Sequence, residues 1–346
     1  MTATELTDEP AIAPGPTRVV LTGAGSPLGD RVMRQLAGCG LDVTAVGVDG
    51  PIAGGDTHPS ADIVVDLGSS DYDGRAAQRE STTWFTAASL AAADATRATH
   101  VVFVSSAMVY GAASNNPVPL TEEAVLRPDV EFVFARQLAS AEELVEQWRL
   151  ADPVRSTTVL RPVIAVAADG SSRLATAYVS GLGRRLAEDD PPSQFLHLDD
   201  LASAVTAAIT QRLDGVFNVA PDGWVPGERV RALSGERPRV PLPERAAEVV
   251  SRLRWQFQRG PIPPGLRSYT LEPWVVANGR LRGNGWLPTV TNEQAYVEST
   301  ESKWWTMISP KRRQELALGT GVLAALIGLA VAAVIGRRQL RRRRRL

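Results

Sequence analysis

The feature that most constrains the fold is a short apolar strand that leads through a glycine-rich turn into a helix, RVVLTGAGSPLGDRVMRQLAG, at residues 18–38. Further apolar strands follow in DVTAVGVDG, ADIVVDL, THVVFVSS and TTVLRPVIAV, and STTWFTAASLAAADATRA between two of them has helical character. Strands in series with intervening helices connect by right-handed crossovers and form a parallel sheet. The sequence therefore predicts a doubly wound parallel α/β sheet.

The glycine-rich turn carries the first chemistry. Gly23, Gly25 and Gly29 lie between strand and helix, where bare backbone can approach a pyrophosphate at the helix N-terminus. Asp49 follows at the end of the second strand, where a carboxylate accepts hydrogen bonds from a ribose diol and repels a 2′-phosphate. The carboxylate of Asp49 therefore favours NAD over NADP. The alternative interpretation is that Asp49 and Gly50 form a simple Asp-Gly turn.

Six short motifs occur in a fixed order between Arg18 and Val297. They are LTGAGSPLG, VVDL, VSSAMVYG, VLRP, FLHLDDLASAV and GWLPTVTNEQAY. Together they resemble the motifs of extended short-chain dehydrogenases/reductases of the NAD-dependent epimerase/dehydratase type. The resemblance implies a Rossmann-like dinucleotide-binding domain, a smaller C-terminal substrate lobe, and VVDL as a third strand on the adenine side. The cofactor contacts that it implies are Gly23, Gly25, Ser26, Pro27, Leu28, Gly29, Asp49, Asp66, Leu67 and Ser105.

Two departures from the family pattern concern the cofactor side. Family glycines three apart would fall at positions 23, 26 and 29, and Ser26 takes the middle place. Because serine is small, we expect the approach to a pyrophosphate to be narrowed and not closed. The family also has an apolar strand before the serine strand, whereas residues 68–99 contain only one helical stretch. Since a gap in a sheet leaves buried backbone groups unpaired, either VVFVSS pairs directly with the first strand or residues 68–80 fill the place irregularly.

The third departure concerns the catalytic pair. The family's Tyr-x-x-x-Lys aligns with FARQL, so that Phe134 stands at the tyrosine position and Leu138 at the lysine position. The resemblance makes the tyrosine the proton donor or acceptor, and the lysine the residue that holds the ribose and lowers the tyrosine's pKa. A lost general acid costs roughly 10²–10⁴ in rate. Arg136 lies one turn away and stays protonated, while Ser106 remains at the family's hydrogen-bonding serine position. We therefore expect the ordinary hydride chemistry to be absent.

Three hypotheses follow for the function. The first is a pseudoenzyme, an NAD-binding domain with weak affinity that senses or scaffolds. The second is an enzyme on a sugar nucleotide or lipid-linked substrate, with Tyr110 or the pair Asp199 and Asp200 as acid/base groups. Packing of Tyr110 after its strand, and an acidic first helical turn for the two aspartates, are the simpler interpretations. The third is a structural interaction domain without a ligand.

Charge is divided sharply along the chain. Residues 1–310 carry 27 basic and 37 acidic residues, whereas the last 36 residues carry ten basic residues and one acidic residue. An acidic body is a poor match for nucleic acid, which needs basic residues over a binding face. The single Cys39 excludes a disulfide framework, and with only three histidines we expect no metal site.

The basic residues of the C-terminal region flank LALGTGVLAALIGLAVAAVIG, residues 316–336, which contains no charge. As a helix it is about 31 Å long, the thickness of a hydrocarbon core. The alternative is an apolar helix packed on the protein. Small residues recur every fourth position and are typical of a helix–helix contact, so a homodimer through this segment is one interpretation and a general Ala/Gly bias is the other. The small residues are Ala324, Gly328, Ala332 and Gly336.

The first 17 residues show no secretory signal, so we expect a single-pass protein of the cell membrane with its main domain in the cytoplasm. The seven arginines after the apolar segment are then expected outside, against the positive-inside preference. That preference alone would instead export the body, and a helix that enters without crossing would keep both ends inside.

The segments expected from the sequence are a disordered lead (1–16), a dinucleotide-binding domain (17–169), a smaller substrate lobe (170–300), a juxtamembrane segment (301–315), a transmembrane helix (316–336) and an arginine-rich tail (337–346).

Overall fold

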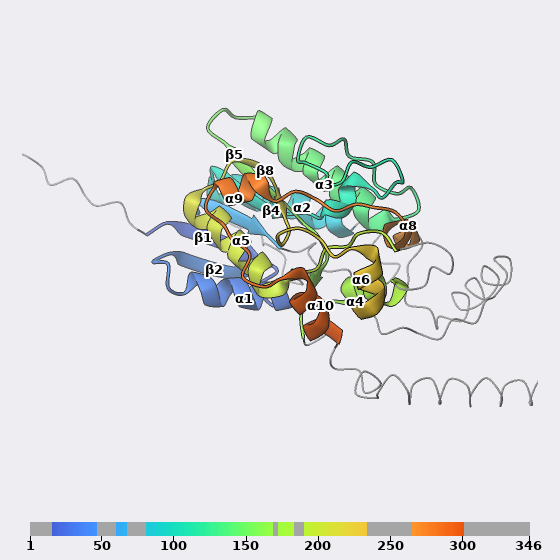
Figure 1. Cartoon of the computed structure of the whole chain (residues 1–346). Coiled ribbons are helices and arrows are strands. Elements are labelled where there is room, and N and C mark those ends of the chain that lie inside the picture. Colours follow the sequence, from blue (N-terminus) through green and yellow to red (C-terminus); the bar gives the residue numbers. More distant parts are fainter. Residues whose placement is uncertain are drawn as a thin grey trace, which may run out of the picture.

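A parallel sheet of six strands forms the centre of the molecule (Figure 1). The computed structural model describes residues 16–46, 60–67, 81–168, 172–182, 190–233 and 265–300. Neighbouring strands follow the order β2-β1-β3-β4-β5-β8. Their bounds are β1 Arg18–Thr22, β2 Asp42–Val46, β3 Ile63–Asp66, β4 His100–Val104, β5 Ser156–Pro162 and β8 Gly215–Val219.

Helices cover both faces of this sheet. On one face α1 (Pro27–Leu36) packs against α5 (Leu198–Gln211), and on the other α2 (Ser81–Thr96) packs against α3 (Val133–Leu150). Every residue of β3 and β4 is buried, which is typical of parallel strands covered on both faces. The predicted Rossmann-like α/β sheet is confirmed.

The position of β3 corrects two expectations. Its residues pair with β1, from Val19 opposite Ile63 to Thr22 opposite Asp66, and on the other side with β4. The VVDL strand therefore lies between the first strand and the serine strand, not on the adenine side. Both expectations for the gap were wrong, because β3 itself pairs with β1 on one side and with β4 on the other. The physical reason is that a continuous apolar run suits a strand buried on both faces, a stronger constraint than the order of a motif.

A smaller lobe lies beyond the carboxyl end of β5 and includes a two-stranded parallel sheet. In Figure 1 its helices α4, α6, α8 and α10 gather at one end of the main sheet, and the short helix α9 lies near β8. The remaining elements are η2 Ala107–Tyr110, β6 Ala165–Val166, α4 Arg173–Gly181, β7 Leu196–His197, α6 Gly227–Leu233, α8 Leu266–Leu271, α9 Gly279–Gly283 and α10 Asn292–Thr300.

Buried aromatic rings join this lobe to the start of α3. Consecutive ring centroids lie 4.8–6.3 Å apart, within the range of favourable edge-to-face and tilted contacts. The rings in order are Phe132, Tyr269, Trp274, Tyr178, Phe195 and Tyr296. The lobe and the sheet therefore share one apolar core.

Several sequence predictions lie outside the described residues. These are Asp49, the lead before residue 16, and everything after residue 300, including the apolar segment 316–336 with its stripe of small residues. Within the part of the chain that the structure describes, none of the helices combines the length and the apolar character needed to cross a membrane.

Candidate functional site

The carboxyl ends of β1, β4 and β5 meet the N-termini of α1 and α5, the place where open α/β sheets bind ligands. A cavity of about 50 Å³ lies there, small beside the roughly 300–1,000 Å³ typical of ligand pockets. Six sequence-predicted residues meet around it, and residues 162–165, Ser172, Leu174, Leu198 and Leu201 complete its wall. The six are Ser26, Pro27, Leu28, Ser105, Ser106 and Phe134.

Glycine is required at position 29 of the turn. A Cβ there would lie 2.4 Å from the carbonyl oxygen of Gly23 and 2.6 Å from that of Ala24, closer than real Cβ atoms approach. Gly23 has a φ of 78°, in the left-handed region that favours glycine. A Cβ on Gly25 would meet no atom within 4 Å. Gly23 and Gly29 therefore shape the turn, whereas packing does not require Gly25.

Ser26 uses one of the amide donors at the N-terminus of α1. It is the N-cap of α1, and its hydroxyl oxygen accepts the N–H of Gly29 at 3.0 Å. Pro27 follows as the first helical residue and has no N–H. The donor set therefore fits a pyrophosphate poorly. The Gly29 N–H is used by the Ser26 hydroxyl and the Asp30 N–H by the Ser26 carbonyl oxygen, which leaves the Leu28 N–H.

The positions of the family's catalytic pair are apolar and buried. Phe134 is 8% exposed and forms part of the cavity wall, and Leu138 is fully buried in α3. Arg136 is exposed on the same helix. Ser106 is the N-cap of η2, where its hydroxyl accepts the N–H of Met108 at 3.2 Å. None of these four side chains supplies an acid or base to the cavity.

A buried polar network lies below the site. The Ser105 hydroxyl donates to Glu142 at 2.5 Å, and Arg161 forms a two-pronged ion pair with Glu142, with its shortest N–O distance 2.6 Å. Arg161 also donates to the Tyr110 hydroxyl at 2.8 Å, which in turn donates to Asn218 Oδ1 at 2.8 Å. Sequence reasoning missed Arg161, although an arginine inside the strand TTVLRP signals a buried partner.

Ionisation in this network favours a structural role. Burial raises the pKa of the Tyr110 hydroxyl, and the nearby Arg161 acts against this rise without cancelling it. Burial also acts against protonated Arg161, but its hydrogen bonds and the charge of Glu142 raise the pKa of Arg161 above its ordinary value. Tyr110 therefore stays protonated and engaged, as its packing interpretation predicts.

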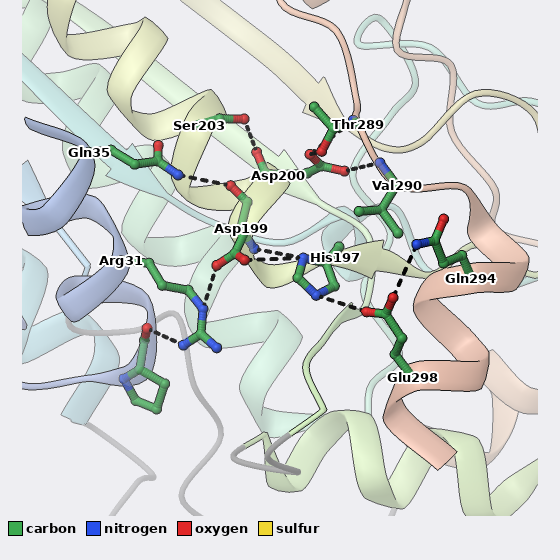
Figure 2. Close-up of polar contacts among 11 residues, drawn as sticks. Arg31, Gln35, His197, Asp199, Asp200, Ser203, Thr289, Val290, Gln294 and Glu298 are labelled. Atoms are coloured by element: carbon green, nitrogen blue, oxygen red, sulfur yellow. Dashed lines mark hydrogen bonds and ion pairs between the residues drawn. The ribbon is translucent and has the colours of Figure 1, made fainter. Parts of the chain in front are cut away.

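The two aspartates of α5 face other elements and not the cavity. Asp200 is 1% exposed and accepts hydrogen bonds from the Thr289 N–H at 3.0 Å, the Thr289 hydroxyl at 2.6 Å and the Val290 N–H at 3.0 Å. Asp199 forms an ion pair with Arg31 of α1 at 2.7 Å. Figure 2 shows both aspartates, with His197, the N-cap of α5, beside them. Their first-turn interpretation is supported.

The sequence model of the NAD dependent epimerase/dehydratase family matches residues 55–220. No curated protein sequence matches the chain. Among solved structures, UDP-glucose 4-epimerase of Thermus thermophilus in complex with NAD is similar, with 16% identity and a TM-score of 0.59 over 82% of this chain and 98% of that one. RMD of Pseudomonas aeruginosa complexed with NADPH is similar with 20% identity and a TM-score of 0.57, over 82% and 98% of the two chains.

UDP-glucose 4-epimerase of Bifidobacterium longum in complex with NAD⁺ and UDP is also similar, with 17% identity and a TM-score of 0.58 over 84% of this chain and 99% of that one. Identities this low show the fold alone. The family model adds the sequence evidence, since its match runs from before β3 to the end of β8 and includes the serine strand and the α5 motif. The chain therefore resembles the NAD dependent epimerase/dehydratase family, in sequence over residues 55–220 and in fold over the structures compared.

Proposed function

We propose that this chain is a family member without hydride chemistry, which binds NAD at most weakly and acts as a membrane-attached sensor or scaffold. The observation that carries the proposal is Phe134. Its ring forms part of the cavity wall at the position where the family resemblance requires a tyrosine hydroxyl. A phenyl ring neither donates nor accepts a proton, so the reaction that the resemblance implies has no acid/base group there.

The rest of the cavity wall supports this conclusion. Among the described residues that line it, the only protic side chains are the hydroxyls of four serines. A serine hydroxyl is a poor base unless a second group takes its proton. The alternative acid/base candidates Tyr110, Asp199 and Asp200 do not line the cavity and have structural partners. The hypothesis of an active enzyme with replacement residues therefore has no support in this site.

The proposed NAD binding and the proposed membrane attachment rest on different observations. Solved relatives are complexed with NAD or NADPH, whereas the start of α1 in this chain offers a reduced set of amide donors. Weak NAD binding reconciles these two facts. The membrane attachment rests on the uncharged segment 316–336 and on its basic flanks.

The loss of chemistry is tested by restoring the pair. Phe134→Tyr with Leu138→Lys is expected to raise NAD affinity more than the sum of the two single changes, because the two residues act as a unit in the family. Leu138→Lys alone should destabilise the fold, since it buries an ammonium group without a partner. Calorimetric NAD titration of the full chain in detergent, with thermal unfolding of each variant, measures both effects.

Arg136→Lys is the matched control, since it adds a lysine to the same helix at an exposed position and should leave NAD affinity unchanged. Strictly additive effects of the pair would contradict the alignment of this helix with the family's catalytic helix. Turnover of UDP-glucose by the native chain as fast as by the double variant would contradict the absence of hydride chemistry.

A further inference from the structure

Of the first three helical residues of α1, only Leu28 offers an N–H that its cap does not use. The amides at the start of a helix are those that point toward a bound anion. In α1 the first helical residue is Pro27, which has no N–H, and the Gly29 N–H donates to the Ser26 hydroxyl at 3.0 Å. The serine oxygen thus makes the contact that a phosphate oxygen makes at a helix N-terminus.

Three amide donors in the loop before α1 also form hydrogen bonds within the chain. The N–H groups of Gly23 and Ala24 both donate to the carbonyl oxygen of Val46, at 3.0 and 3.3 Å. The Ser26 N–H donates to the carbonyl oxygen of Gly23 at 3.0 Å. These donors are therefore directed toward the end of β2 and into the turn itself, away from a ligand in front of the helix.

The negative charges around the turn oppose the binding of a phosphate group. Asp30 is exposed in the first turn of α1, and the buried Asp66 lies in register with Thr22, directly before the turn. Arg31 of the next turn is held by its ion pair with Asp199 and by the Pro27 carbonyl oxygen, which accepts its hydrogen bond at 2.8 Å (Figure 2). Its charge is thereby largely neutralised before any phosphate arrives.

We propose that Ser26 and Pro27 form a built-in lock that excludes the pyrophosphate of a dinucleotide from this site. The lock explains why the proposed NAD binding is weak, and it rests on the proposed function only for the location of the site. It is physically separate from the loss of chemistry, since the lock lies in the first turn of α1 and the lost pair lies on α3. Removing the lock restores binding without restoring turnover.

The test is calorimetric binding of ADP-ribose, which contains the pyrophosphate but no nicotinamide, to the full-length chain in detergent. Ser26→Gly frees the Gly29 N–H, and Pro27→Ala supplies the missing amide. We expect the native chain to bind in the millimolar range and the double variant at least about tenfold more tightly, because each new hydrogen bond to a charged group contributes that order of affinity. Glycine is a tolerated N-cap, so the variant should fold.

Thr291→Gly is the matched control. The Thr291 hydroxyl accepts the Gln294 N–H at 3.3 Å at the start of α10, Thr291 does not line the cavity, and its substitution should leave ADP-ribose affinity unchanged. Pro27→Ala alone retains the serine cap and should give part of the gain. Micromolar binding by the native chain, or unchanged affinity in folded Pro27→Ala and double variants, would overturn the lock. Because ADP-ribose carries no nicotinamide, neither outcome bears on the loss of hydride chemistry.

Discussion

At the residue scale, His100 is a neutral imidazole inside the core. It begins β4 with 1% of its surface exposed, and its two ring nitrogens lie 2.7 Å from the Ser156 hydroxyl and 3.1 Å from the Thr158 hydroxyl. Burial lowers the pKa of His100 from 6.5 to about 4, and the charge of Arg212 acts in the same direction. The hydroxyls satisfy the neutral ring, and a proton added to it would be buried without an adjacent carboxylate among its hydrogen-bond partners.

This shift predicts an acid-sensitive fold. Between pH 6.5 and about 4 the unfolded chain binds a proton that the folded chain does not, so stability is complete above pH 6.5 and falls as the pH is lowered. The loss reaches about 3 kcal/mol at the lower end. Urea unfolding at pH 7.5 and pH 5 measures it, and His100→Gln should lose less stability between the two pH values than the native chain. His197→Gln is the reference variant. If His100→Gln lost as much stability between pH 7.5 and pH 5 as the native chain, the buried His100 would not be the origin of the acid sensitivity.

At the element scale, the sequence predicted the strands β1 to β5 of the sheet, because their apolar runs and the glycine turn are local signals. It did not predict β8, whose residues were assigned to the smaller lobe. It did not predict the order of β3, because pairing depends on which strand can be buried on both faces, a property of the assembled sheet. The site divides in the same way. Phe134 and Ser106 were identified from the resemblance to the family's motifs, whereas the Arg161–Glu142 pair joins a strand to a helix that no local pattern connects. The N-cap role of Ser26 could have been predicted from the sequence, since serine followed by proline is typical of a helix start.

The contact between α5 and the segment before α10 gives a prediction at this scale. Asp200→Ala removes the acceptor of three hydrogen bonds and leaves the Thr289 and Val290 amides without it. We expect a loss of about 2–4 kcal/mol and faster hydrogen exchange in α10. Asp199→Ala is the matched control, because its ion pair with Arg31 is partly exposed and should contribute less than about 1 kcal/mol. Equal losses in the two variants would contradict the structural role of Asp200.

At the scale of the whole molecule, the uncharged segment 316–336 with its basic flanks predicts attachment to a membrane, and we propose that the body lies in the cytoplasm. Deletion of residues 311–346 is expected to move the chain from the membrane fraction to the soluble fraction, because it removes the uncharged segment. Deletion of residues 337–346 alone should leave it in the membrane fraction. Protease added to spheroplasts should leave the body intact, and detergent-free recovery of the full chain in the soluble fraction would disprove the attachment.

The order of the strands in the sheet also affects how the chain folds during its synthesis. The chain leaves the ribosome with its N-terminus first. β5 can pair with its outer neighbour β8 only after β6, α4, β7, α5 and β8 have been synthesised. Until then the edge of β5, with Thr158 and Leu160, has no partner of its own sheet on that side. Parallel pairing across such long separations closes slowly, and exposed strand edges invite association with other chains. The lobe elements β6, α4 and β7 are thus produced while the sheet that supports them is still incomplete, which makes this interval the one in which a chaperone is most needed.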